Sequence, residues 1–261
     1  LKGYCYIKLN LNILNHLGLT LYSNTPSVLS EIVANSYDAD ATEVRIFCDQ
    51  NNDIITIVDN GIGMNDQDIN EKFLRVGYQK RKSGEEFSKI YKRPVMGRKG
   101  IGKLSLFSIA NTISVHSRKN NENQDDVLNE SAFKMSLDEI HKSIESPSSH
   151  EHKGYIPEEI AFDDNLLGST GTKIIITDLK KDIARSEDFL RKRLSRRFSF
   201  SGAKGGFRIY VNDHELKLED RGYIDKLDIE IIKSKIDYAK TKQGHCKSDI
   251  EQLENRYEGL K

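Results

Sequence analysis

Apolar residues recur at helical spacing early in the chain, between positions 26 and 41. Val28 and Ile32 share one side of that stretch, because residues three and four apart lie on the same face of a helix. Thr25 is placed to cap such a helix, and Pro26 suits its first turn, where no backbone N–H donor is required. The pattern predicts an amphipathic helix over residues 26–41.

Two following stretches alternate between apolar and polar residues, as half-buried strands do. They predict strands over residues 42–49 and 53–59, joined as a hairpin by a turn at Asn51 and Asn52. The same alternation predicts further strands over 112–117, 133–137 and 207–211, and an apolar run predicts a core strand over 172–179. Helical spacing predicts helices over 9–19, 66–76, 100–110 and 188–200.

Polar segments separate these elements. Residues 79–98 carry many lysines and arginines without an apolar period, so we expect a mobile segment there. We expect surface loops over 119–130 and 139–164. Strands that gather with helices between non-adjacent segments predict an α+β fold, a two-layer sandwich of helices on a mixed, mostly antiparallel sheet.

Composition narrows the class of protein. The 261 residues are 37% hydrophobic and 31% charged, with 40 basic and 40 acidic side chains. These values are typical of a globular chain with one large or two modest domains. The balanced charge gives no indication of nucleic-acid binding. The chain has no run of about 18 apolar residues, so we expect no membrane span.

The termini and the cysteines bear on the compartment. Cys5, Cys48 and Cys246 are too scattered for a disulfide framework or a metal site, so we expect a reducing cytoplasm. Residues 1–15 lack the basic start and the long apolar core of a signal peptide. Because the first residue is Leu1 and not Met, we expect the chain to be a fragment of a longer protein, and we expect it to come from the N-terminal part of that protein.

The helix predicted over 26–41 carries the first candidate site. Glu31, Asn35 and Asp38 are four and three residues apart, so they point the same way. The amide oxygen of Asn35 is a hard ligand suited to magnesium, which keeps several of its waters. A carboxylate one turn away can orient or deprotonate a water beside a phosphate. The alternative is a solvated polar face with a capping role.

The second candidate begins at Asp59 and continues through Gly61, Gly63 and Met64. Two glycines one residue apart let the backbone turn tightly and approach a planar ligand. An acid at a strand end can accept a hydrogen bond from an exocyclic amine, such as that of adenine. The alternatives are an ordinary turn or a calcium-type acidic loop, and the alternating oxygen ligands of an EF-hand are absent.

Two further candidates lie downstream. Residues 97–103, Gly-Arg-Lys-Gly-Ile-Gly-Lys, expose backbone N–H groups directly before an apolar helix, whose N-terminus attracts phosphate. Their spacing fits neither a P-loop nor a Rossmann fingerprint, and a flexible hinge is the alternative. Thr172, at the start of a strand, can offer its hydroxyl to a ligand or a water, or can simply favour the strand.

The order and spacing of these stretches resemble the GHKL ATPase superfamily, which includes gyrase, the ninety-kilodalton heat-shock chaperones, histidine kinases and MutL. Residues 31–35 match its N box, and residues 59–63, 97–102 and 171–172 match its three glycine boxes. The resemblance covers residues 9–215 and looks closest to the MORC- and chaperone-like branch. It implies a Bergerat-type ATP-binding fold with ATP and Mg²⁺ as cofactors.

The resemblance also implies a role for each residue. Glu31 would be the general base that activates water, and Asn35 would bind the Mg²⁺ that bridges the phosphates. Asp59 would accept the adenine amine, and Gly63 would pass against the ring. The rest of the implied nucleotide site is Asp38 and Met64 in the purine pocket, Gly61 in the first glycine box, Thr172 beside the acid, and Gly97, Gly100, Ile101, Gly102 and Lys103 around the phosphates.

Residues 77–100 would then form a lid that closes over ATP and couples to dimerisation. Lys103 follows Gly102 immediately, whereas related branches often place a Lys two residues after that glycine. Lys80 and Arg81 are therefore alternative phosphate contacts. Gyrase and MutL also take a catalytic Lys from a following transducer domain, which we cannot identify here. We expect slow hydrolysis by this chain alone.

The leading hypothesis is a magnesium-dependent, slowly hydrolysing ATP-binding domain over residues 1–215, with a surface excursion over 119–168 and a charged connector over 216–261. It would act as a nucleotide-driven clamp or switch and form an ATP-dependent homodimer. One alternative is a histidine-kinase-type phosphotransferase, although no dimerisation helix with a phospho-acceptor His is evident. Another is a non-hydrolysing ATP-binding interaction module, DNA-associated through the basic residues 191–197, which equally suit a solvated helix face.

Overall fold

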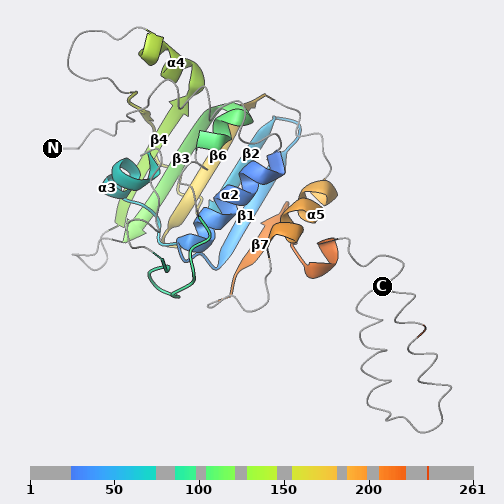
Figure 1. Ribbon diagram of the computed structural model, residues 1–261. Helices are drawn as coiled ribbons and strands as arrows, with labels where there is room; N and C mark the ends of the chain where they lie inside the picture. The colour runs from blue at the N-terminus through green and yellow to red at the C-terminus, as the bar shows by residue number, and fades with distance from the viewer. Residues whose placement is uncertain are drawn as a thin grey trace, which may run out of the picture.

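The computed structural model describes residues 25–74, 86–97, 104–120, 128–145, 155–180, 187–198, 206–221 and 234. Their strands form one sheet of eight, in the order β5-β4-β3-β6-β2-β1-β7-β8 (Figure 1). β1 and β7 are parallel neighbours, and the other neighbouring pairs are antiparallel. The mixed, mostly antiparallel sheet is therefore confirmed. The strands are β1 (Glu43–Asp49), β2 (Ile54–Asp59), β3 (Ala110–Asn120), β4 (Leu128–Ser136), β5 (Glu158–Glu159), β6 (Gly171–Leu179), β7 (Arg208–Val211) and β8 (His214–Glu215).

Helices cover one face of this sheet and form the second layer. α2 (Thr25–Asp38) lies across β1 and β2, and α5 (Glu187–Arg197) lies beside it over β7 (Figure 1). α4 (Leu137–Glu145) follows β4 directly. The shorter helical elements are α3 (Asp66–Asp68), the π-helical turn η1 (Ile69–Phe73) and the 3₁₀ turns η3 (Leu104–Ser108) and η4 (Leu218–Arg221).

The core lies between the two layers. Ile46, Ile57, Ile174 and Val115 are successive register partners across β1, β2, β6 and β3, so they form one row on the same face of the sheet. All are buried, as are the apolar residues of α2, including Leu29, which has no exposed surface. Each such side chain contributes roughly 1.5–3 kcal/mol when it leaves water. The apolar side predicted for the helix over 26–41 is therefore the side that anchors α2 to the sheet.

One local expectation was wrong, and another was right in kind but too short. The helix predicted over 100–110 is, within the described residues, only the 3₁₀ turn Leu104–Ser108, and Ala110 already begins β3. Apolar residues of this stretch, among them Phe107, are buried, and a short buried run cannot be assigned to helix or strand by its period. The strand predicted over 133–137 is part of β4, a nine-residue strand that begins at Leu128 and ends at Ser136.

The expected surface loops are also more regular than the sequence indicated. α4 occupies the start of the stretch 139–164, and β5 pairs with β4 further along. Lys119 and Asn129, inside the loop expected at 119–130, are register partners across β3 and β4, and the ion pair of Arg118 with Glu130 stands beside them. The helix predicted over 9–19 lies outside the described residues.

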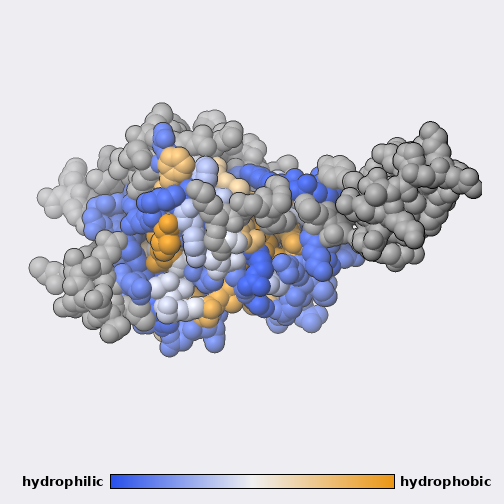
Figure 2. Space-filling model, turned by 90° about the horizontal axis from the view of Figure 1, so that it is seen from below, coloured by the Kyte–Doolittle hydropathy of each residue, from blue (hydrophilic) through white to orange (hydrophobic). Residues whose placement is uncertain are grey.

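Among the coloured residues seen from below the view of Figure 1, hydrophilic ones predominate, with small hydrophobic areas between them (Figure 2). Within the part of the chain that the structure describes, no helix combines the length and hydrophobicity needed to cross a membrane.

Candidate functional site

A cavity of about 240 Å³ opens beside the C-terminal half of α2. Its wall also includes the end of β2, the segment 86–97, the α3–η1 turn and parts of β3 and β6. The structure therefore brings together residues that the sequence spreads over some 140 positions. The residues proposed from the sequence that line it are Asn35, Asp38, Asp59, Gly63, Met64, Gly97 and Thr172.

Asp59, the last residue of β2, is buried in this wall. Its Oδ1 accepts hydrogen bonds from the backbone N–H of Gly61 at 2.9 Å and of Thr172 at 3.3 Å, and its Oδ2 accepts one from the Ser36 hydroxyl at 2.7 Å. Burial raises the pKa of the Asp59 carboxyl, against the lowering effect of these hydrogen bonds. A carboxylate offers about four acceptor positions, so one remains for a ligand.

Thr172 is held in place by its neighbours in the sheet. It is the register partner of Asp59 on β2 and of Ser117 on β3. The hydroxyls of Ser117 and Thr172 lie 3.0 Å apart, and the Ser117 hydroxyl also accepts the backbone N–H of Met64 at 2.9 Å. These contacts connect the first and third glycine stretches, which the sequence separates by more than a hundred residues.

Glycine is required at two points where backbones meet. A Cβ on Gly63 would lie 1.9 Å from the carbonyl oxygen of Arg118, and φ at Gly63 is +67°. A Cβ on Gly171 would lie 2.1 Å from the carbonyl oxygen of Asp59. Both contacts are far shorter than any side chain tolerates, so these glycines let β3, β6 and the loop after β2 close around the cavity.

Asp38 lines the cavity and also anchors the segment 86–97. Its two oxygens accept the backbone N–H groups of Met96 at 2.7 Å and of Gly97 at 3.1 Å. Asp40, two residues after Asp38, does the same for the backbone N–H groups of Ile90 at 2.7 Å and of Tyr91 at 3.0 Å. Asn35 lies next to this anchor: its Oδ1 is 3.7 Å from the place where a Cβ on Gly97 would stand.

Arg93 fixes the same segment from inside the protein. Only 1% of its surface is exposed, and its guanidinium donates to the carbonyl oxygens of Ala41 at 2.6 Å and of Gly206 at 2.8 Å. It also lies over the rings of Tyr37 and Phe207, at 4.8 and 5.7 Å from their centroids. The segment 86–97 is therefore joined to both α2 and the start of β7 by one side chain.

Glu31 is placed differently from the rest of its predicted face. It is not among the residues that line the cavity, although Asn35, one turn further along α2, is. Its Oε1 accepts a hydrogen bond from the guanidinium of Arg197, the last residue of α5. The structure thus separates the proposed general base from the proposed magnesium ligand.

Three charged side chains in the cavity wall, those of Asp68, Lys72 and Lys119, were not predicted from the sequence. Lys119 donates to Asp68 at 2.7 Å, and Lys72 lies 3.5 Å from the same carboxyl. Burial alone would raise the pKa of the Asp68 carboxyl, but the hydrogen bond from Lys119 and the charges of both lysines hold it below its usual value. Ser36 and Ser117 were also missed. Their types carry no functional signal, and only the folded sheet brings them to Asp59 and Thr172.

Several proposed residues lie outside the described part of the chain. They are Gly100, Ile101, Gly102 and Lys103, together with the alternative phosphate contacts Lys80 and Arg81. Of the lid expected over 77–100, the described residues are 86–97.

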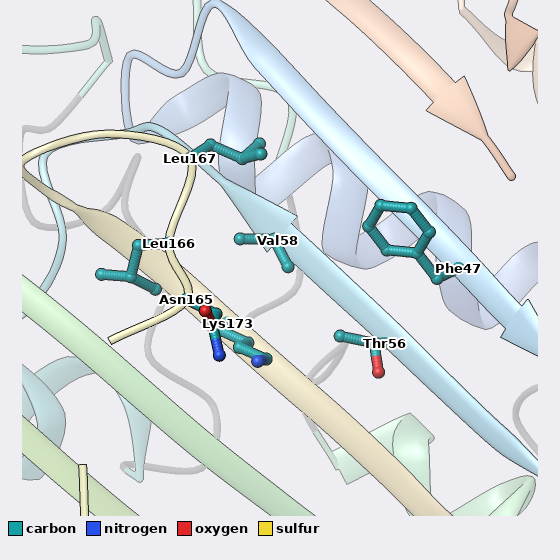
Figure 3. Close-up of a pocket in the computed structure, with 7 residues that line it drawn as sticks. All are labelled: Phe47, Thr56, Val58, Asn165, Leu166, Leu167 and Lys173. Carbon is teal, nitrogen blue, oxygen red and sulfur yellow. The ribbon is translucent and has the colours of Figure 1, made fainter. Parts of the chain in front are cut away.

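A second hollow, of about 320 Å³, lies on the face of the sheet turned away from α2 (Figure 3). Phe47, Thr56 and Val58 form its floor, and the loop carrying Leu166 crosses above them. Its one amine, on Lys173, is paired with Asp163 at 2.5 Å. This hollow lacks the convergent acceptors and glycines of the cavity beside α2, which is therefore the better candidate for a ligand site.

The cavity residues fit ATP with Mg²⁺. The remaining acceptor position of Asp59 suits an exocyclic amine, and Gly63 lines the same cavity. The amide oxygen of Asn35 is a hard ligand beside Gly97, the first residue of the glycine-rich stretch 97–103.

The fold and this cavity define an ATP-binding domain of the GHKL type. The sequence model of the family described as "Histidine kinase-, DNA gyrase B-, and HSP90-like ATPase" matches residues 22–161, more than half of the chain, and the protein belongs to this family. The resemblance found in the four sequence stretches is therefore confirmed. Its finer assignment to a MORC-like branch stays a prediction.

The relatives that the chain resembles are described as different kinds of protein. The chain is 40% identical over 226 residues to a Herpetosiphon aurantiacus protein described as "Putative type II restriction enzyme HgiDII", covering 87% of this chain and 34% of that protein. It is 30% identical over 141 residues to the chaperone protein HtpG of Colwellia psychrerythraea, covering 45% of this chain and 21% of the chaperone. For HtpG of Psychrobacter cryohalolentis the identity is 33% over 127 residues, covering 41% and 19%. The chain thus spans about a third of the first relative and about a fifth of the chaperones.

Proposed function

We propose that this chain binds ATP with magnesium, hydrolyses it slowly, and changes conformation with the nucleotide. The observation that carries the proposal is the buried carboxylate of Asp59 at the cavity wall. It accepts hydrogen bonds from three donors, and one of its acceptor positions remains for a ligand. An acceptor placed in this way suits the amine of adenine. Membership of an ATPase family supports ATP as the ligand.

The roles on α2 are those that the family resemblance implies. Glu31 would take a proton from a water molecule as the water oxygen attacks the terminal phosphorus, and the bond to the bridging oxygen would break, with its electron pair leaving on ADP. Asn35 would be a ligand of Mg²⁺, which neutralises phosphate charge when bound. We propose that residues 97–103 complete the phosphate contacts.

The segment 86–97 is our candidate for the moving part. Its backbone is tied to α2 through Asp38, and Gly97 begins the proposed phosphate loop, so a bound triphosphate would act directly on this connection. Phe87, Ile90 and Met96 in the same segment are exposed by 56%, 63% and 40%. Exposed apolar groups of this kind suit contact with a second copy of the chain, and we propose nucleotide-dependent self-association through them.

The test is ATP binding measured by calorimetry with and without Mg²⁺. We expect wild type to bind in a magnesium-dependent way, Glu31→Ala to bind equally well, and Asn35→Ala to bind more weakly. Asn165→Ala is the matched control, because Asn165 is an exposed amide in the hollow on the opposite face. Absence of ATP binding by the wild type, or equal loss of affinity in Asn165→Ala, would refute the assignment.

A second candidate function is ATP-dependent action in a DNA-processing assembly. It rests on the relative described as a restriction enzyme, which matches most of this chain. The basic helix α5 gives it less support than the sequence indicated. Arg191 is paired with Asp220, Arg196 donates to a backbone carbonyl, and Arg197 is paired with Glu31. DNA binding that falls with salt and is lost on charge reversal at Lys192 and Arg193 would revive the role of α5.

The hydrolytic role is favoured over histidine-kinase-type phosphotransfer. Glu31 stands on α2 one turn from Asn35, as a water-activating base requires, whereas phosphotransfer needs no such base.

The domain boundary is also a proposal. We place Leu218–Arg221 with the ATP-binding domain, because η4 is joined to α5 through Asp220 and through Arg221, which donates to the carbonyl oxygens of Ser195 and Phe198.

A further inference from the structure

The contact between Glu31 and Arg197 joins the two helices that lie side by side on the sheet (Figure 1). Both backbones are fixed. α2 is anchored by its apolar side, and the end of α5 is held by Arg221, whose guanidinium donates to the carbonyl oxygens of Ser195 at 3.0 Å and of Phe198 at 2.9 Å. The ion pair therefore sets where the carboxylate of Glu31 points.

That direction does not bring Glu31 into the cavity wall. Asn35 lines the cavity and Glu31 does not, although they are one turn apart on the same helix. A carboxylate that serves as general base must reach the water beside the phosphate. In this structure the guanidinium of Arg197 bonds Oε1 of Glu31 and so holds the carboxylate at α5.

We propose that Arg197 is a positioning residue that holds Glu31 outside the nucleotide cavity, so that hydrolysis requires this ion pair to open. The inference rests on the proposed role of Glu31 as general base. The two side chains are partly exposed, Glu31 by 21% and Arg197 by 44%, so water can replace the contact. Exposed ion pairs are weak, and the restraint is therefore one that a bound triphosphate can overcome.

The kinetic test compares ATP turnover by Arg197→Ala with wild type. Removal of the restraint should raise kcat about two- to five-fold, which is the range set by the strength of exposed ion pairs, with KM and ATP affinity unchanged. Arg197→Lys, which keeps the charge but loses the planar fork, should lie between the two. Arg193→Ala is the matched control. It removes the same charge from α5, where Arg193 stacks on Phe189 at 5.2 Å.

A second readout does not depend on turnover. The side-chain N–H signals of Arg197 in the NMR spectrum, assigned by their loss in Arg197→Lys, should shift in Glu31→Ala. Addition of Mg²⁺ and a non-hydrolysable ATP analogue to wild type should move them the same way, because the pair opens.

The outcomes separate this inference from the proposed function. A kcat for Arg197→Ala that falls, stays equal to wild type, or remains undetectable while ATP still binds would overturn the restraint and leave ATP binding intact. Arg197 signals that do not respond to Glu31→Ala would do the same. Failure of wild type to bind ATP would overturn the proposed function itself.

Discussion

Replacement of Asp59 by Asn tests the centre of the site, because it changes one atom and almost no volume. The Asn oxygen can keep the bonds from the backbone N–H groups of Gly61 and Thr172, now made to Oδ1 of Asp59 at 2.9 and 3.3 Å. The new amide group then replaces Oδ2, and the Ser36 hydroxyl can rotate to accept from it. The fold should therefore tolerate the change, whereas the remaining acceptor position becomes a donor.

The expected loss of affinity follows from that exchange. A hydrogen bond to a charged group contributes about 1.5–3 kcal/mol, and the amine of adenine would now face another donor. The dissociation constant for ATP should rise about 10- to 150-fold in Asp59→Asn, measured by calorimetry. Asp213→Asn, at a side chain 71% exposed on the protein surface, is the control and should bind ATP as wild type does.

The same variant should change how stability depends on pH. Because burial raises the pKa of Asp59, the folded state holds a proton that the unfolded state has already lost. The contribution of Asp59 to stability is therefore largest at low pH and decreases as pH rises from about 3.9 through the raised folded-state value. Asp59→Asn removes this decrease, so nucleotide-free Asp59→Asn should gain stability relative to wild type as pH rises through that window.

Two measurements would refute the reasoning. One is equal ATP affinity of Asp59→Asn and wild type, which would mean that this acceptor does not meet the nucleotide. The other is a urea unfolding midpoint for nucleotide-free Asp59→Asn that falls below wild type at neutral pH. That result would mean that the charge is needed for folding and that any loss of binding is indirect.

Two further variants test the packing around the site. Gly63→Ala should lose at least about 2–3 kcal/mol of folding free energy in urea unfolding, because its Cβ would stand 1.9 Å from the carbonyl oxygen of Arg118 at a positive φ. Gly168→Ala is the control. The nearest atom to its Cβ would lie at 3.4 Å, so its stability should change by less than about 0.5 kcal/mol. Arg93→Met should lose about 2–4 kcal/mol of folding free energy, because it leaves the carbonyl oxygens that Arg93 bonds unpaired. Arg208→Met, at a side chain 58% exposed, should leave stability nearly unchanged. Similar losses in the two variants would contradict the role assigned to Arg93.

The sequence was sufficient for the parts of the site that depend on local spacing. The face of α2, the hairpin of β1 and β2, and the glycines near Asp59 follow from periods of 3.6 and 2 and from the steric freedom of glycine. They could be predicted because each depends on residues close together in the chain. The core strand β6 was recognised in the same way, from its apolar run.

Long-range contacts could not be predicted in this way. Ser117 reaches Thr172 only because β3 and β6 pair in one particular register, and nothing in a lone serine indicates it. Arg197 belonged to a charge pattern that equally suits a solvated face, so its contact with Glu31 became visible only when α2 and α5 were placed together. The stretch 100–110 failed for another reason, since burial on several sides removes the period that distinguishes a helix from a strand.

The parallel pairing of β1 with β7 has a consequence for how the chain folds. β1 ends at Asp49, and its partner begins at Arg208, so about 160 residues must be made before that side of β1 is covered. Pairing across so long a separation is slow, and an uncovered strand edge can pair with other chains while it waits. During synthesis, therefore, that edge of β1 lacks its partner until β7 leaves the ribosome. Shortened chains that end before Arg208 should therefore aggregate more readily than the full chain.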